Sequence, residues 1–286
     1  MKKTLALATT FALASATPVL AQSLQQRIQD ARLSAAHTTS IGVDGRSAVG
    51  TTPAPQTPTE AVTLPADIAD LPEAGDDEVT LGGYVALTID DGPFAHTPEF
   101  LELLAEHDVL ATFFVIGEHV TALPEETAMI VAAGHELANH SYTHVNLTTL
   151  DFDAVMEELV LTQEAIYAIT GEHTNLFRAP YLSVNDTVLE ATAELGLSIF
   201  SADAIGQDWE NISPEQIASN VLANISNGSI ILLHEQWDLA TDRTMLALPI
   251  IFAELAERGL TVVTLSELIA LQGMSIEAGA VYSRIG

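Results

Sequence analysis

The chain has 286 residues, 48% of them hydrophobic. This length and composition allow one α/β barrel or two smaller domains and exclude a disordered protein. Its formal charge of −30 makes nucleic acid and anionic lipid improbable partners, because a surface this acidic repels both. The sequence has no cysteine, so any metal must be bound by histidine and carboxylate.

Residues 1–21 have the pattern of a secretory signal peptide. Lys2 and Lys3 precede an apolar, alanine-rich run that ends at the small residues Val19 and Ala21. The pattern predicts cleavage after Ala21 and export by a bacterium to the periplasm or the medium, with no membrane insertion of the mature form. The mature chain keeps seven arginines against 39 acidic residues, a formal charge of 7 − 39 = −32. Such a surface is suited to salty surroundings, where ions screen the self-repulsion.

Residues 22–82 are rich in Ser, Thr, Pro and Gly and are expected to form a low-complexity linker and N-terminal extension. From residue 83 onward, apolar runs alternate with stretches of helical periodicity. Strands are predicted at 84–89, 111–116, 135–139, 176–178, 198–202, 229–233 and 260–265. Helices are predicted at 97–107, 124–133, 151–170, 185–195, 214–225 and 243–258. This alternation favours one α/β domain over 83–272, a barrel of about seven parallel strands, followed by a C-terminal tail at 273–286.

Polar residues follow several of these strands. The first strand ends in Asp90 and Asp91, which the turn residues Gly92 and Pro93 follow. Two adjacent carboxylates at a strand end indicate a site, although Asp-Asp-Gly is also ordinary turn chemistry.

Two histidines, His140 and His144, lie four residues apart, a spacing that brings both imidazoles to one side of a helix or tight turn. The pattern suits a divalent metal, and two surface histidines are the alternative. The upstream stretch His135-Glu136 resembles the start of a zinc-peptidase helix, but position 139 is Asn where that motif needs histidine.

Three further strands also run into polar residues. Arg178 ends one of them and requires a carboxylate partner if it is buried, since a guanidinium keeps its charge. Asp208 and Trp209 follow the next strand, and His234 ends another. Each is weak alone, because structural roles are common for all these residue types. Together, polar clusters at the carboxyl ends of five parallel strands are what a barrel active site requires.

In this order, the five stretches resemble the motifs of the NodB-homology polysaccharide deacetylases, carbohydrate esterase family 4. They are Ile89-Asp-Asp-Gly-Pro93, His140-Ser-Tyr-Thr-His144, Arg178-Ala-Pro-Tyr181, Asp208-Trp209 and Leu232-Leu-His234. The resemblance extends over residues 83–272 and implies a distorted (β/α) barrel of NodB-homology type. Ile89 replaces the usual Phe, and Val145 stands where the family often has Pro, both apolar changes.

The resemblance also implies a role for each residue. Asp90 is the general base, and Asp91, His140 and His144 bind one divalent metal, zinc first, with cobalt, nickel or manganese as alternatives. Arg178 orients Asp90, and the backbone amide of Tyr181 faces the oxyanion. Asp208 holds His234, the general acid, with Asp203 as a competing partner. Trp209 and Leu232 form the pocket for the acetyl group.

The function implied is metal-dependent removal of acetyl groups from N-acetylated amino sugars of a glycan such as chitin or peptidoglycan. An amine is a poor leaving group and needs a proton donor, which favours this reaction over O-deacetylation of acetylated xylan. A glycan-binding or metal-binding module without turnover and a metal-dependent phosphoesterase are the alternatives from other classes. The acidic surface has a second interpretation here, attraction of a cationic glycan product. The sequence leaves the glycan and the oligomeric state open.

Overall fold

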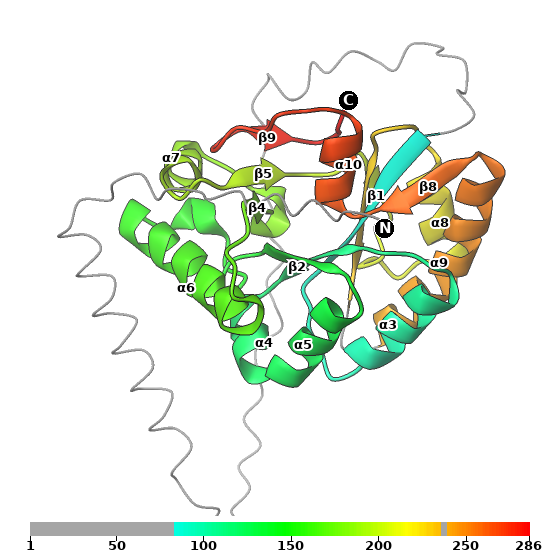
Figure 1. The fold of residues 1–286 in the computed structure, drawn as a ribbon, viewed down its shortest axis with the longest axis horizontal. Helices are drawn as coiled ribbons and strands as arrows, with labels where there is room; N and C mark the ends of the chain where they lie inside the picture. The colour runs from blue at the N-terminus through cyan, green and yellow to red at the C-terminus, as the bar shows by residue number, and fades with distance from the viewer. Residues whose placement is uncertain (1–82, 236–238) are drawn as a thin grey trace, which may run out of the picture. The chain divides into compact units, whose positions relative to one another are not determined.

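One curled sheet of parallel strands organises the computed structural model, which describes residues 83–235 and 239–286 (Figure 1). The predicted signal peptide and N-terminal extension lie outside the described residues. The strands are β1 (Gly83–Asp90), β2 (Thr112–Val115), β3 (Glu136–Asn139), β4 (Leu176–Phe177), β5 (Ser198–Phe200), β6 (Ala204–Ile205), β7 (Ile230–His234), β8 (Leu260–Val263) and β9 (Val281–Tyr282). The predicted α/β barrel with parallel strands is thereby confirmed, and β6 and β9 are additional short strands.

The strand order shows how far the sheet curls. It runs β6-β7-β1-β2-β3-β4-β5-β9, with β8 also paired to β1. Only residues 201–203 separate β5 from β6 in sequence, although the two lie near opposite ends of this order. Four Cα steps span at most about 14 Å, so the two sides of the sheet must approach one another. No described pairing joins β6 to β9, and the result is a distorted, incompletely closed barrel.

Helices cover the outer face of the sheet (Figure 1). They are α3 (Thr97–Glu106), α4 (Gly117–Ala122), α5 (Pro124–Ala132), α6 (Phe152–Thr170), α7 (Asp186–Glu194), α8 (Pro214–Leu222) and α9 (Leu239–Glu257). The longest predicted helix begins as expected, because the Asp151 side chain accepts a hydrogen bond from the Ala154 amide and caps α6. In the described ranges, no helix is both long and apolar enough to cross a membrane.

The alternation of β1 side chains separates two apolar cores. Val85, Leu87 and Ile89 point outward into the core beneath the helices, whereas Ala86 points into the barrel interior. The interior is closed by α10 (Leu265–Leu271), whose buried leucines pack with Ala86 in the interior core. Leu265 was expected to end the last strand and instead starts this helix, because the side chains of Thr264 and Glu267 form a capping box there.

The segment predicted as a C-terminal tail packs against the domain. It contributes β9 beside β5 and a fully buried side chain, Ile285.

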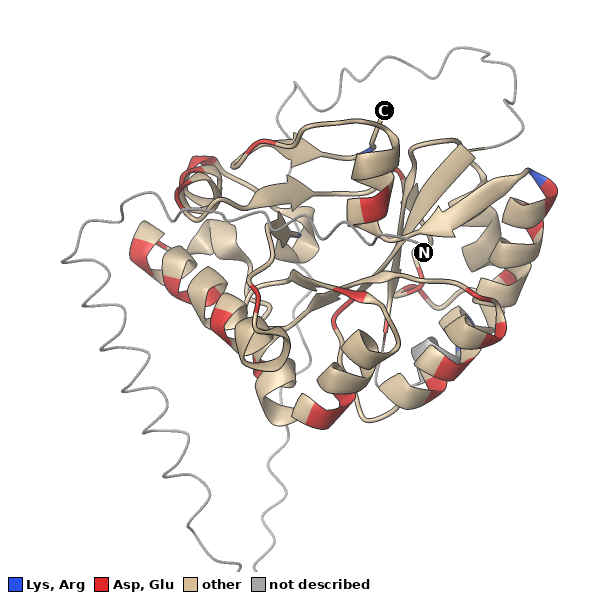
Figure 2. Cartoon of the chain, in the orientation of Figure 1, with Lys and Arg blue, Asp and Glu red and all other residues tan. Residues whose placement is uncertain are grey.

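Acidic residues are spread over the helices, and the few basic ones are confined to isolated positions (Figure 2). The carboxyl ends of the parallel strands lie at one rim of the barrel, and the exterior of the barrel is acidic.

Candidate metal centre and active site

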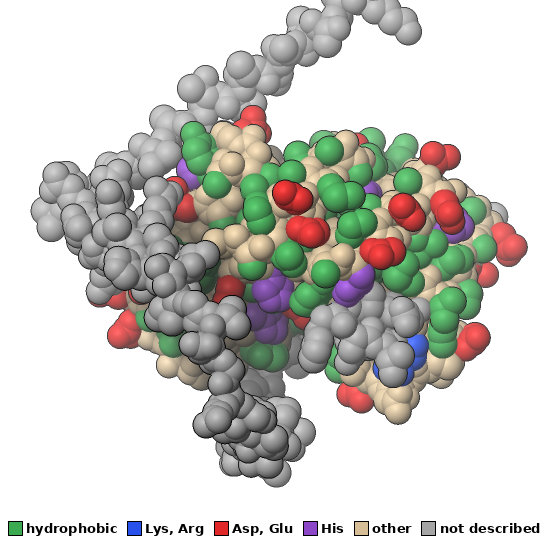
Figure 3. Space-filling model, turned by 90° about the horizontal axis from the view of Figure 1, so that it is seen from below, with side chains coloured by type: hydrophobic (Ala, Val, Ile, Leu, Met, Phe, Trp, Pro, Cys, Tyr) green, Lys and Arg blue, Asp and Glu red, His purple; other side chains and the backbone are tan. Residues whose placement is uncertain are grey.

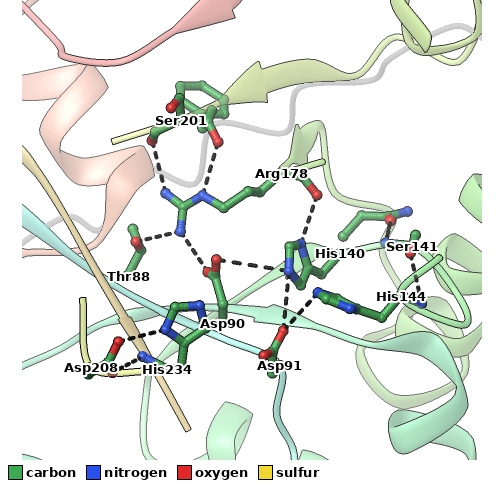
Figure 4. Close-up of polar contacts among 12 residues, drawn as sticks. Thr88, Asp90, Asp91, His140, Ser141, His144, Arg178, Ser201, Asp208 and His234 are labelled. Atoms are coloured by element: carbon green, nitrogen blue, oxygen red, sulfur yellow. Dashed lines mark hydrogen bonds and ion pairs between the residues drawn. The ribbon is translucent and has the colours of Figure 1, made fainter. Parts of the chain in front are cut away.

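The side chains after β1, β3, β4 and β6 and at the end of β7 converge at the carboxyl ends of the strands (Figure 4). Asp90 ends β1 and Asp91 follows it. In an extended strand these neighbours would point to opposite faces. Asp91 instead has a left-handed backbone, φ 76°, which breaks the alternation. Both carboxylates then face His140: one oxygen of Asp90 and one of Asp91 lie 3.9 and 3.4 Å from His140 Nε2.

A three-residue cluster of Asp91, His140 and His144 has the composition of a metal site. Asp91 Oδ1 lies 3.4 Å from His140 Nε2 and 3.2 Å from His144 Nε2, and the three ligand atoms all lie within 4.8 Å of one another. Tetrahedral bonds of about 2.0–2.1 Å place neighbouring ligand atoms about 3.3–3.4 Å apart. The spacing therefore fits a small divalent cation.

The protonation states of these three residues also favour binding of a cation. His140 Nδ1 lies 2.8 Å from the Arg178 carbonyl oxygen, which can only accept, so the neutral ring presents its Nε2 lone pair. Burial is the main cause that lowers the pKa of His144 to about 4, so this imidazole is neutral at pH 7. Burial tends to raise the pKa of Asp91, but the nearby His140 imidazole, 3.4 Å from its Oδ1, holds this pKa well below its usual range. Within the described part of the chain, the buried Asp91 Oδ1 has no hydrogen-bond partner. Three electron-pair donors therefore converge on one point.

The loop that carries the two histidines is a tight turn, one of the two geometries that their spacing allowed. Ser141 and His144 both have positive φ, 64° and 58°. Glu158 of α6 holds the turn: its carboxylate accepts hydrogen bonds from the amides of Tyr142 and Thr143, both at 2.8 Å. Such strained backbone persists where surrounding contacts fix it. The sequence offered no signal for Glu158, which lies within a regular amphipathic helix.

Arg178 crosses the barrel interior and binds Asp90. Its guanidinium is fully buried, lies 2.6 Å from Asp90 Oδ1, and also donates to the Thr88 hydroxyl and to the carbonyls of Phe200 and Ser201. The carboxylate partner that a buried arginine requires is therefore Asp90. Since Arg178 occupies Oδ1, Asp90 turns Oδ2 toward the metal cluster.

His234 is held by Asp208. Asp208 Oδ1 lies 2.8 Å from His234 Nδ1, and Oδ2 accepts hydrogen bonds from the His234 amide and the Thr244 hydroxyl. Burial tends to lower the pKa of His234, but the hydrogen bond and charge of Asp208 raise it to about 9. Asp203, the competing candidate, instead accepts from Ser229 and from the Ile230 amide at the opposite end of β7. Among the described residues, no hydrogen bond engages the Nε2–H of this imidazolium, which is therefore available to a substrate.

The residues predicted to contact substrate border the same site. Tyr181 is 66% exposed, and its ring packs against His144. Its backbone is left-handed, φ 59°, and its amide has no acceptor among the described residues, as an oxyanion donor requires. Trp209 is 49% exposed and stands edge-on to His234. Leu232 is buried in the interior core, two residues before His234.

Glu235 is a residue beside the site that the sequence analysis missed. Its side chain is fully buried, accepts a hydrogen bond from the Thr97 hydroxyl, and lies so close to Gly92 that a Cβ atom there would approach Glu235 Oε2 to 2.3 Å. The Glu235 amide donates to the Asp90 carbonyl. Burial raises the pKa of Glu235 to about 7. Glu235 therefore links the loop after His234 to the loop after Asp91.

A cluster suited to a cation, a buried carboxylate and a histidine paired with a carboxylate, all at one rim of the barrel, are the groups that metal-assisted acyl hydrolysis requires. Sequence comparison agrees, since the family profile of polysaccharide deacetylases matches residues 77–200. The chain is 35% identical over 196 residues to a chitooligosaccharide deacetylase of Bradyrhizobium, covering 64% of this chain and 90% of that one. The chain belongs to the polysaccharide deacetylase family.

Other relatives differ in named substrate and in length. A bifunctional xylanase/deacetylase of Pseudobutyrivibrio xylanivorans is 37% identical, over 67% of this chain and 31% of its own length. A peptidoglycan-N-acetylglucosamine deacetylase of Bacillus cereus is 34% identical, over 63% of this chain and 66% of its own length. Among solved structures, a family 4 acetyl xylan esterase of Clostridium thermocellum in complex with a cobalt ion superimposes with a TM-score of 0.66 at 31% identity, over 71% of this chain and 98% of that one.

Proposed function

We propose that this protein hydrolyses acetyl groups from the N-acetylated amino sugars of a chitin-type or peptidoglycan-type glycan. The observation that carries the proposal is the pairing of His234 with the buried Asp208, across the site from the metal-binding cluster. An amine leaves an amide only if it is protonated. A histidine held in its charged form beside a metal site supplies that proton.

The residues divide the reaction between them. Asp91, His140 and His144 would hold a divalent cation, which would lower the pKa of the attacking water and polarise the acetyl carbonyl. Asp90 Oδ2 accepts the proton of that water, while Arg178 fixes Oδ1. The free Tyr181 amide donates to the oxyanion.

His234 completes the reaction by giving its Nε2 proton to the departing amine, and Asp208 stabilises the imidazolium beforehand. Trp209 and Leu232 border the acetyl group in this assignment. A glycan-binding module without turnover does not need both a base and an acid, so the pair supports an enzyme.

Two further parts of the proposal concern the metal and the compartment. We assign zinc, because two imidazoles and one carboxylate form a preferred zinc ligand set with room for water. Export to the periplasm or medium is proposed from the basic, then apolar, then small-residue pattern of residues 1–21.

Acetate release measured side by side on chitin oligomers, peptidoglycan and acetylated xylan tests the proposal. We expect acetate and an equal amount of free amine from an N-acetylated glycan. The names of the xylanase/deacetylase and the acetyl xylan esterase support O-deacetylation of xylan as the second candidate. Acetate from acetylated xylan alone would replace our proposal with that activity.

A further inference from the structure

A pocket of about 430 Å³ opens beside the metal-binding cluster. Five residues line it in addition to Asp91 and His144: Phe94, Ile116, Glu118, His119 and Thr143. They come from the loops after β1, β2 and β3 and from the start of α4. Pockets for small molecules and sugars have volumes of about 300–1,000 Å³. None of Tyr181, Trp209 and Leu232, assigned above to the reacting sugar, lines this pocket.

The pocket is held rigidly against the metal cluster. His119 Nδ1 lies 2.9 Å from the Asp91 carbonyl oxygen, and the amides of Gly117 and Glu118 donate to the carbonyls of Ser141 and Tyr142 in the histidine turn. The Phe94 ring packs against His119, with centroids 4.9 Å apart. A ligand in this pocket would therefore occupy a fixed position relative to the reacting acetyl group.

Glu118 determines the charge of the pocket. It is exposed, and among the described residues no side chain donates a hydrogen bond to its carboxylate. Asp91 is the other acid of the lining, and a cation bound in the cluster offsets it. No arginine lines the pocket, and lysine is absent from residues 83–286.

The basic residues of the described chain are engaged elsewhere. Arg178 is buried with Asp90, Arg243 donates to Asn211, Arg258 pairs with Glu254, and Arg284 donates to the Asn227 carbonyl. Figure 3 shows blue at a single place on the face seen there, red over much of it, and purple histidines close together near its middle. Beyond the cation held by Asp91, His140 and His144, the pocket offers an anionic sugar no arginine or lysine, whereas it offers an ammonium group the carboxylate of Glu118.

We propose that this pocket binds the amino sugar next to the reacting one and favours a sugar that already carries a free, cationic amine. The inference rests on the proposed function, since deacetylation itself creates that amine. Each turnover on a polymer would then produce a better substrate for the next, so that acetyl groups are removed from consecutive sugars. Glycans with a carboxylate on the neighbouring sugar would be disfavoured.

The test compares three tetramers by kcat/KM for acetate release: fully N-acetylated chitotetraose, the same tetramer with one glucosamine, and a peptidoglycan-derived tetramer with muramic acid. We expect the cationic tetramer to exceed the neutral one by about threefold to fivefold at low salt, the scale of one partly exposed ion pair. The preference should disappear in about 1 M NaCl, where the screening length is only about 3 Å.

Variants assign the preference to the pocket. In Glu118→Gln the ratio of cationic to neutral substrate should fall to about one, and in Glu118→Lys it should invert. Glu125→Gln, which removes the same charge from an exposed position of α5 outside the pocket, should keep the wild-type ratio.

Two outcomes overturn the inference in distinguishable ways. If chitotetraose is deacetylated but wild type shows no preference for the cationic tetramer, or if Glu118→Gln and Glu125→Gln change the ratio equally, the pocket does not select charge and the deacetylase assignment stands. If none of the three tetramers releases acetate, the proposed function fails together with the inference.

Discussion

Replacing Asp208 with asparagine should move the pH profile rather than abolish activity. In the wild type, Asp208 is the main group that raises the pKa of the buried His234 to about 9. The Asp208→Asn side chain can still accept from the His234 amide, but it has no charge to stabilise the imidazolium. Burial is then opposed only by the weaker effects of the Asp90 and Asp91 charges, and the pKa of His234 falls toward its ordinary 6.5.

The size of the effect follows from the fraction of His234 that carries a proton. At pH 8 this fraction is about 90% for a pKa of 9 and about 3% for a pKa of 6.5, so activity should fall about 30-fold, whereas at pH 6 it should fall less than about twofold. A cation bound in the cluster neutralises the charge of Asp91, so the alkaline limb of the wild-type pH profile should lie somewhat below pH 9. The shift remains large, because Asp208 contributes more than Asp91 to the raised pKa of His234.

The assay is kcat/KM for acetate release from chitotetraose between pH 5 and pH 10, which reports groups of the free enzyme. Asp203→Asn is the matched control, because Asp203 bonds at the other end of β7 and should leave the alkaline limb in place. The reasoning is refuted if Asp208→Asn lowers activity by the same factor at every pH, or if the two variants shift the limb equally.

Three further outcomes are expected. His140→Ala should be purified without metal, whereas Asp90→Asn should retain metal and lose turnover, because a ligand forms the site and a base only moves a proton; metal analysis that finds the reverse would contradict the assignment. The melting temperature should rise from low salt to about 1 M NaCl as the self-repulsion is screened, and a flat or falling curve would remove the salt-adaptation interpretation. Glu235 has its pKa raised from 4.5 to about 7, so it binds more protons in the folded state, and wild-type stability should fall as pH rises from about 4.5 through 7. Glu235→Gln should lack this loss. Measured by denaturant, its free energy of unfolding minus that of the wild type should be up to about 3 kcal/mol larger at pH 8 than at pH 5. An equal difference at both pH values would show that burial does not destabilise the Glu235 carboxylate.

The elements that sequence predicted well are those whose pattern is local. Most of the predicted strands show an apolar run, and Asp151 lies at the start of its helix as capping chemistry expects. Three strands have only two residues, too few to produce a periodic pattern; β4 could be predicted because its apolar residues end at Arg178, whereas β6 and β9 were missed. The helix α10 was missed because its apolar start continues the run of the preceding strand.

The candidate site shows the same division. Each polar cluster could be found because it interrupts an apolar strand, and parallel strands necessarily end at one rim. The choice between Asp203 and Asp208 could not be made from sequence, since it depends on which end of β7 each loop residue reaches. Glu158 and Glu235 are acids on a helix and in a loop, and only their buried contacts distinguish them from surface charge.

Arg178 gives Asp90, the proposed base, a structural role as well. Its guanidinium has no exposed surface, lies 4.1 Å from the centre of the Phe114 ring, and has Asp90 as its counter-ion. Removing one partner of a buried ion pair commonly costs about 3–5 kcal/mol. A substitution that removes the charge of Asp90 would therefore lower the stability of the fold together with the proposed activity. Mutational drift at this position is opposed by the buried arginine as well as by the chemistry of the site.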